Sequence, residues 1–96
     1  MIVTDTFGRS WRLGIANVAI GAAGIEVLRD HTGLHDPAGY ELYSTVIALA
    51  DEIAAAAELV MGKTDRVPAA VVRGLSVAGD GTGADLVMPP EQDLFR

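Results

Sequence analysis

The clearest pattern of hydrophobic and polar positions lies in the middle of the chain, where apolar residues recur at helical spacing. Asp36 is a favourable N-cap and Pro37 suits the first helical position, so the pattern predicts a helix that begins there. Gly62 is its predicted end, which gives one long amphipathic helix of about 25 residues. The apolar stripe consists of Leu42, Tyr43, Val46, Ile47, Ala50, Ile53, Ala54, Ala57, Val60 and Met61. The carboxylates lie largely off the stripe and indicate a solvated face, with Asp51 and Glu52 as candidate exceptions.

Shorter apolar segments on both sides of this helix predict strands. Residues 1–4 read as the end of a strand, and residues 5–10 read as a polar turn. Residues 11–27 are small, apolar and partly β-branched, and glycines at about 1 kcal/mol each favour a strand or irregular backbone over a helix there. Residues 29–36 form a turn-rich connector, and residues 68–73 predict a short apolar strand.

The last part of the chain, residues 78–96, is rich in glycine and proline. Its first part, AGDGTGA, predicts a flexible loop, and its second part reads as a linker. Gly79, Gly81 and Ala84 fit the dinucleotide-binding fingerprint loosely, but no helix is predicted after them, so we reject that interpretation.

These elements predict an α+β fold, an incomplete mixed sheet with one long amphipathic helix packed across it. The 96 residues allow one small domain, and many of the apolar residues are alanines, which bury little area. We therefore expect residues 1–96 to form a single partial domain. Its sheet edge at residues 1–4 is expected to be completed by dimerisation or by a missing N-terminal region.

Charge and composition exclude several classes of function. The net charge of −6 argues against binding to nucleic acid or to an anionic membrane surface. The absence of cysteine excludes disulfides and thiolate metal sites. The apolar run at residues 15–28 is too short and too glycine-rich to span a bilayer, and the N-terminus lacks the features of a signal peptide. A cytoplasmic protein is therefore expected.

Oxygen-bearing and cationic side chains gather near the N-terminus. Asp5 and Thr6 place a carboxylate beside a hydroxyl where a strand is expected to end, an arrangement typical of ligands for a hard cation. Arg9 and Arg12 follow, and guanidinium groups suit phosphate or carboxylate. The alternative is a surface turn in which Asp5 bonds the backbone and both arginines are solvated.

Gly62, Lys63 and Thr64 resemble the end of a phosphate-binding P-loop. The first glycine of that motif would fall at Ala57, and these three residues close a helix, whereas a P-loop opens one. We therefore interpret them as a helix C-cap, from which Lys63 is still able to contact phosphate from another direction.

His31 and His35 are four residues apart, which suggests a metal site. On a helix they would share a face, but Gly33 between them argues against a helix. Exposed histidines in a turn are favoured over a zinc site.

Read together, these motifs resemble a known family. The segments DTFGRSWR at residues 5–12 and NVAIG at residues 17–21 closely resemble the signature of coenzyme F-420:L-glutamate ligase, or gamma-glutamyl ligase. The resemblance continues through Asp30, Gly33, Asp36, Gly39 and Thr45, then ADE at 50–52, AELVMGK at 57–63 and VRG at 72–74. It covers essentially the whole chain.

The resemblance implies that the chain is the C-terminal part of the catalytic domain of a GTP-dependent ligase. In that family GTP phosphorylates the terminal carboxylate of the coenzyme F-420 precursor, and the amine of L-glutamate then displaces phosphate to form an amide. Divalent Mg²⁺ or Mn²⁺ bridges the phosphates. The implied partners are GTP, L-glutamate and the precursor. With the charge and the free sheet edge described above, we expect no nucleic acid and no membrane as partners, and a homodimer or pairing with a missing N-terminal region.

The resemblance also implies roles for individual residues. Asp5 corresponds to a metal ligand, and Thr6 corresponds to a ligand of a second metal. The M-G-[QK] turn of the nucleotide and metal site falls on Met61, Gly62, Lys63 and Thr64. Lys63 stands where some relatives have glutamine, and since an ammonium group does not ligate a cation, phosphate contact is expected instead. Arg9 and Arg12 are expected as clamps for substrate or phosphate because of their charge.

One departure from the family leaves the activity of the chain open. Family members carry a long region before this motif, with a nucleotide-binding loop, a lysine and a further metal-binding aspartate, and none of these is present. The ligase would then need that region from elsewhere. The alternatives are a non-catalytic fragment or oligomeric scaffold module, and a bare nucleotide- or metal-binding domain.

Overall fold

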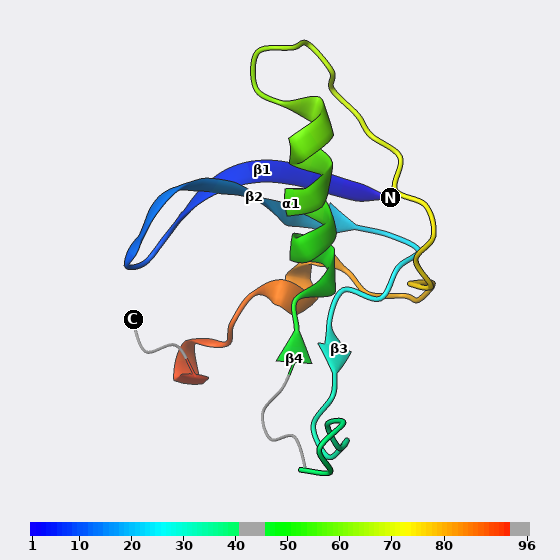
Figure 1. Ribbon diagram of the computed structural model, residues 1–96. Helices are drawn as coiled ribbons and strands as arrows, with labels where there is room; N and C mark the ends of the chain where they lie inside the picture. Colours follow the sequence, from blue (N-terminus) through cyan, green and yellow to red (C-terminus); the bar gives the residue numbers. More distant parts are fainter. Residues whose placement is uncertain (41–45, 93–96) are drawn as a thin grey trace.

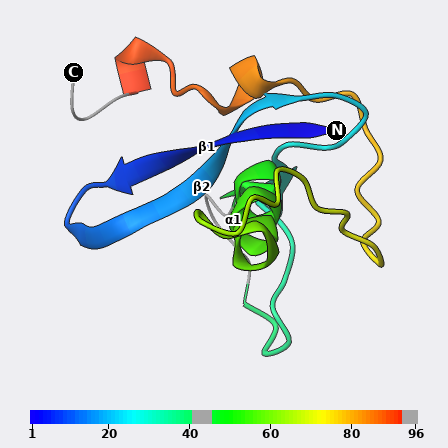
Figure 2. The same cartoon turned by 90° about the horizontal axis from the view of Figure 1, so that it is seen from above.

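A hairpin and one helix form the centre of the α+β fold (Figure 1). The computed structural model describes residues 1–40 and 46–92. Its elements are β1 (Ile2–Arg9), β2 (Arg12–Ala22), β3 (Arg29–Asp30), β4 (Val46–Ile47), α1 (Leu49–Met61) and the 3₁₀ turns η1 (Gly83–Leu86) and η2 (Pro90–Gln92). β1 pairs with β2 and β3 with β4, both antiparallel. Figure 2 shows α1 on one side of the hairpin and the two 3₁₀ turns on the other. The predicted α+β class, with an incomplete sheet and a helix packed on it, is confirmed.

The β1–β2 hairpin contains a β-bulge beside the helix. Val3 pairs with Gly21 but Thr4 pairs with Ala19, so Ile20 is an extra residue in β2. The Ala19 N–H donates to Asp51 Oδ1 at 2.9 Å, which joins the first turn of α1 to β2. Asp51 thus has a structural partner, and its position in the first helical turn also suits the helix dipole.

Small residues let α1 lie close to the hairpin. The core cluster consists of Ala19, Ile25, Val27 and Ala50, with Ile2, Ala22, Val77 and Leu86 partly buried against it. Ala50 has no exposed surface, and the described residues include no large side chain that is fully buried. The fold therefore depends on close backbone approach more than on large apolar groups.

The glycine-rich segment at residues 78–84 packs against the end of β2 and the residues that follow it, contrary to the flexible loop that the sequence predicts. The Glu26 N–H donates to the Val77 carbonyl and the Gly81 N–H to the Ile25 carbonyl, both at 2.8 Å. A Cβ added at Gly79 would lie 2.8 Å from the Glu26 backbone nitrogen. These glycines thus permit a close approach between two backbone segments.

Replacement of Gly79 by alanine is expected to destabilise the chain. Because the added Cβ meets backbone atoms, residues 25–26 must shift, and the free energy of unfolding should fall by about 1–3 kcal/mol. Urea denaturation followed by circular dichroism measures this change. Gly8→Ala is the matched control, since a Cβ at Gly8 meets no atom within 4 Å. Equal stability of the two variants would contradict the close approach.

The helix begins later than the sequence predicts. Asp36 does act as a cap, but its Oδ1 accepts the N–H groups of Ala38 and Tyr40 in a turn, at 2.9 and 3.0 Å. Val46 and Ile47 form β4, so α1 starts only at Leu49 and has 13 residues. The predicted helix is therefore wrong before Leu49 wherever the chain is described, and residues 41–45 lie outside the described residues.

Two other local predictions are also corrected. Residues 5–9 continue β1, so the turn of the hairpin is confined to Ser10 and Trp11, with Trp11 in the left-handed region at φ 59°. Residues 68–73 have no strand partner among the residues that the structure describes. The predicted strand within residues 11–27 is confirmed as β2.

Candidate functional site

Asp5 and Thr6 lie in the middle of β1, opposite Val18 and Asn17 of β2. Asp5 is exposed and Thr6 is half-buried. Neighbouring residues of a strand point to opposite faces, yet Asp5 Oδ1 accepts the Thr6 N–H at 2.8 Å. This contact brings the carboxylate to the edge of β1, on the same side as the Thr6 amide.

A buried asparagine joins this strand pair to the end of the helix. Asn17 is 4% exposed, and its Oδ1 accepts a hydrogen bond from Lys63 Nζ at 2.9 Å. Its Nδ2 donates to Thr4 Oγ1 at 3.5 Å. Since Thr6 is the cross-strand partner of Asn17, the Lys63 ammonium group binds the residue that lies opposite Thr6. The structure therefore brings Lys63 to the strands that carry Asp5 and Thr6.

Asn17 was not among the predicted site residues. The signal in the sequence is one amide side chain inside an otherwise apolar run, between Ala16 and Val18. A buried amide requires hydrogen-bond partners, so its presence there indicates a polar contact across the fold. Its role follows from the structure, because Lys63 is distant in the sequence.

The contact between Asn17 and Lys63 is expected to appear as non-additive stability. In a double-mutant cycle of Asn17→Ala and Lys63→Ala, the coupling free energy should be at least about 0.5 kcal/mol. Urea denaturation of the wild type, both single variants and the double variant measures it. Additivity within about 0.3 kcal/mol would show that the two side chains do not interact.

The turn after α1 is shaped by Gly62. Gly62 has φ 65°, and its N–H donates to the Glu58 carbonyl at 2.8 Å, which confirms that the helix ends there. A Cβ at this position would lie 2.7 Å from Asp65 Oδ2. Met61 is half-buried and Thr64 is exposed. The turn thus directs Lys63 back to the hairpin while Thr64 stays in solvent.

Arg9 and Arg12 do not join this group. They pair at the tip of the hairpin, where both are exposed, and Arg9 Nη2 donates to the Leu13 carbonyl at 2.9 Å. At a rise of about 3.3 Å per residue, Arg9 lies about 13 Å along β1 from Asp5. Their role as clamps stays a prediction.

The connector carries both histidines, and among residues 1–40 and 46–92 no group of three or more His, Cys, Asp or Glu side chains is placed to hold a metal ion. His35 is exposed. Hydrogen bonds from the Thr32 hydroxyl and N–H lower the pKa of the Asp30 carboxyl below its ordinary value. Asp30 therefore serves the local turn.

The donor set fits a hard cation in part. Asp5 and Thr6 offer carboxylate and hydroxyl oxygens, which Mg²⁺ and Mn²⁺ prefer. Mg²⁺ is commonly held by one or two carboxylates together with substrate phosphates and water, and Asp5 offers one such carboxylate. Asn17 Oδ1 already accepts from Lys63.

Among residues 1–40 and 46–92, no helix is long and apolar enough to cross a membrane.

The family model and the relatives that match this chain all point to one family. The family model described as F420-0:Gamma-glutamyl ligase matches residues 1–74. The coenzyme F420:L-glutamate ligase of Archaeoglobus fulgidus is 46% identical over 97 residues, which cover 100% of this chain and 39% of that protein. The ligase of the same name from Haloarcula marismortui is 51% identical over 98 residues, covering 100% of the chain and 38% of that protein.

The ligase of the same name from Methanocaldococcus jannaschii is 44% identical over an alignment of 98 residues, which covers 100% of this chain and 39% of that protein. The chain thus spans about two-fifths of the length of the curated relatives it matches. The matched region contains Asp5, Thr6, Asn17 and Lys63. The chain belongs to the F420-0:gamma-glutamyl ligase family.

Proposed function

We propose that this chain supplies one side of the active site of a GTP-dependent ligase that joins L-glutamate to the coenzyme F-420 precursor. The observation that carries the proposal is the 2.9 Å contact between Lys63 Nζ and Asn17 Oδ1. It holds the ammonium group of Lys63 at the β2 residue that lies opposite Thr6. A cationic side chain and oxygen ligands for a metal ion are the groups that phosphoryl transfer requires.

The reaction that we propose has two steps. The γ-phosphoryl group of GTP passes to the precursor carboxylate, which leaves GDP and an acyl phosphate. The amine of L-glutamate then attacks the acyl carbon, phosphate leaves, and the amine proton passes to solvent. A bound Mg²⁺ or Mn²⁺ ion would supply charge neutralisation at the phosphates.

The described residues have distinct roles in this proposal. Asp5 and Thr6 would hold the cation, and Lys63 would contact a phosphate oxygen. Asn17 fixes the direction of Lys63 by accepting one of its three N–H bonds, which leaves donors for phosphate. The backbone of the turn at Met61, Gly62 and Thr64 would adjoin the nucleotide. Arg9 and Arg12 lie at the tip of the hairpin, so they would contact only those parts of the substrates that extend beyond the centre of the hairpin.

Further residues are needed for turnover, because the chain spans about two-fifths of its relatives. We propose that the rest of the ligase fold, or a homodimer, brings them. A scaffold module without turnover is the competing function.

A ligation assay separates these functions. The chain is mixed with the remaining part of the Archaeoglobus fulgidus ligase, GTP, Mn²⁺, L-glutamate and the precursor. We expect GDP, phosphate and a product one glutamyl residue heavier, all dependent on both parts. Formation of a complex without GDP or product would support the scaffold module and contradict the ligase proposal.

A further inference from the structure

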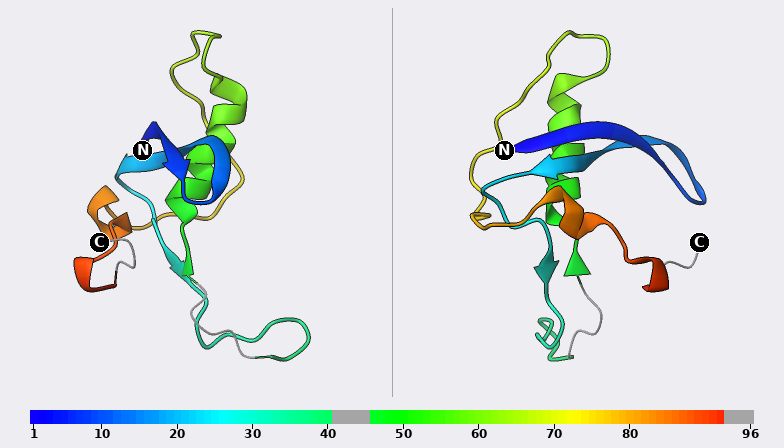
Figure 3. Two further views of the ribbon diagram at one scale, coloured as in Figure 1. Left: turned by 90° about the vertical axis from the view of Figure 1, so that its left-hand side faces the viewer. Right: turned by 180° about the vertical axis from the view of Figure 1, so that it is seen from behind.

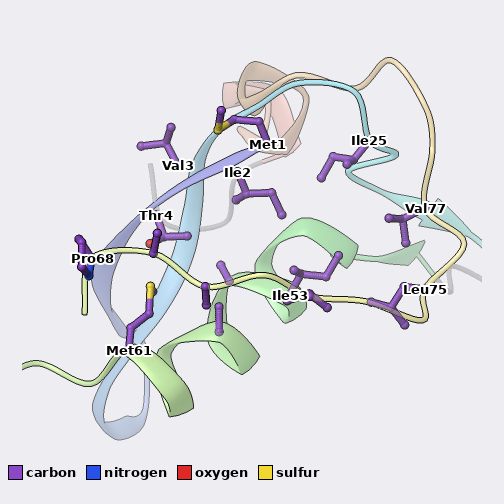
Figure 4. Close-up of a pocket in the computed structure, with 15 residues that line it drawn as sticks. Met1, Ile2, Val3, Thr4, Ile25, Ile53, Met61, Pro68, Leu75 and Val77 are labelled. Atoms are coloured by element: carbon purple, nitrogen blue, oxygen red, sulfur yellow. The ribbon is translucent and has the colours of Figure 1, made fainter. Parts of the chain in front are cut away.

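An apolar cavity of about 560 Å³ lies beside the start of β1, and we call it the edge cavity. Residues of β1, α1 and the segment 68–77 line it, together with Met1 and Ile25 (Figure 4). Its lining includes Ile2, Thr4, Ile53, Ala57, Met61 and Val77. None of the lining residues carries a charged side chain, so a metal ion would find no carboxylate ligand there.

The edge of β1 that faces this cavity pairs with no strand among the residues that the structure describes. Met1 exchanges hydrogen bonds with Ala23 on the β2 side, at 2.9 Å each. In an antiparallel pair the next residues alternate, so the backbone groups of Ile2 and Thr4 point away from β2. Within residues 1–40 and 46–92 these groups have no hydrogen-bond partner in another element. A free strand edge is a template for another strand.

The helix extends beyond this edge. Its 13 residues span about 20 Å, whereas two strands about 4.8 Å apart cover about half of that length. The half near Ala50 lies under the hairpin, while Ile53, Ala57 and Met61 line the edge cavity. Figure 3 shows the upper part of α1 standing clear of both strands. The apolar face of α1 thus has room for a further strand next to β1.

The far side of the cavity is formed by residues 68–77. Residues 68–73 have no strand partner among the described residues, and Val72 is 45% exposed although it lines the cavity. The relatives are more than twice as long as this chain, so their fold contains segments that this structure lacks. A second copy of this chain fits less well, because two chains of net charge −6 repel each other.

We propose that a β-strand from the part of the ligase fold outside this chain occupies the edge cavity. It would pair with β1 at Ile2 and Thr4 and cover Ile53, Ala57 and Met61 of α1. Since every second residue would face α1, the strand should carry apolar side chains at alternate positions. The inference rests on membership of the family and not on the metal chemistry of the proposed site.

Hydrogen exchange and a matched pair of variants test this inference. The chain is mixed with the remaining part of the Archaeoglobus fulgidus ligase, without GTP or metal, and amide exchange of β1 is compared with that of the chain alone. We expect a one-to-one complex in which exchange at Ile2 and Thr4 slows at least about tenfold. Ala57→Glu, which places a charge in the cavity, should weaken the complex about 100-fold.

Ala56→Glu is the control, because Ala56 is exposed and does not line the cavity. Circular dichroism checks that both variants keep the helix. The inference would be overturned by a complex in which Ile2 and Thr4 stay unprotected, by equal binding of the two variants, or by a dimer of this chain alone that protects the same amides. A complex that protects β1 without ligase activity would contradict only the proposed function.

Discussion

Asp5→Ala is expected to abolish metal-dependent GTP binding while the fold stays intact. Asp5 is exposed, and among the described residues its carboxylate bonds only the neighbouring Thr6 N–H, so its removal disturbs no packing. Loss of an outer-shell partner of a bound metal already costs about 10–100-fold in affinity, so loss of a ligand should reach at least about 100-fold. Calorimetric titration of GTP in the presence of Mn²⁺ measures this change.

The control for this variant is Asp80→Ala, which removes an exposed carboxylate of the glycine-rich segment and changes the net charge equally. Its GTP affinity should match the wild type. Unchanged affinity in Asp5→Ala would remove Asp5 from the site. An equal loss in both variants would assign the effect to net charge instead of ligation.

Ala50→Asp is expected to have the largest effect on stability. Ala50 is completely buried in the core cluster, and its N–H donates to the Val27 carbonyl at 3.1 Å. A carboxylate there would gain about 0.3–1 kcal/mol from the N-terminal end of the helix dipole. An unpaired buried charge costs about 3–5 kcal/mol, so burial outweighs the dipole. The free energy of unfolding should fall by at least about 2 kcal/mol.

Ala56→Asp is the matched variant on the exposed side of α1. It should lower the free energy of unfolding by about 0.5 kcal/mol, which is the difference in helix propensity. Urea denaturation followed by circular dichroism compares the two. A similar small loss at both positions would show that α1 does not lie on the hairpin, and the contact of Lys63 with Asn17 would lose its support.

The fold was predictable where local chemistry decides and not where distant pairing decides. Gly62 is the end of α1 both in the sequence prediction and in the structure, because the backbone there has a positive φ, which glycine adopts without strain. Asp36 misled the prediction, since the same carboxylate that caps a helix also caps a turn. Val46 and Ile47 fit the helical stripe, but they pair with Arg29 and Asp30, which no local pattern indicates.

The candidate site was predictable in part for the same reason. Asp5, Thr6 and Lys63 have side chains whose chemistry is visible in the sequence, and the structure brings Lys63 to Asn17, the residue that lies opposite Thr6. The lone amide of Asn17 in an apolar run indicates a polar contact, but no local pattern identifies Lys63, 46 positions away, as its partner. A glycine-rich composition does not distinguish a flexible segment from one whose backbone packs closely against another segment, as the glycines at residues 79–83 do.

The central claim is that the strands carrying Asp5 and Thr6, together with Lys63, form one side of a metal-dependent nucleotide site. Its most direct test is calorimetric titration of GTP into the purified chain, with and without Mn²⁺. The account predicts heat of binding only when Mn²⁺ is present. GTP binding of equal strength without the metal, or no binding at high GTP concentration while circular dichroism shows the helix intact, would contradict it.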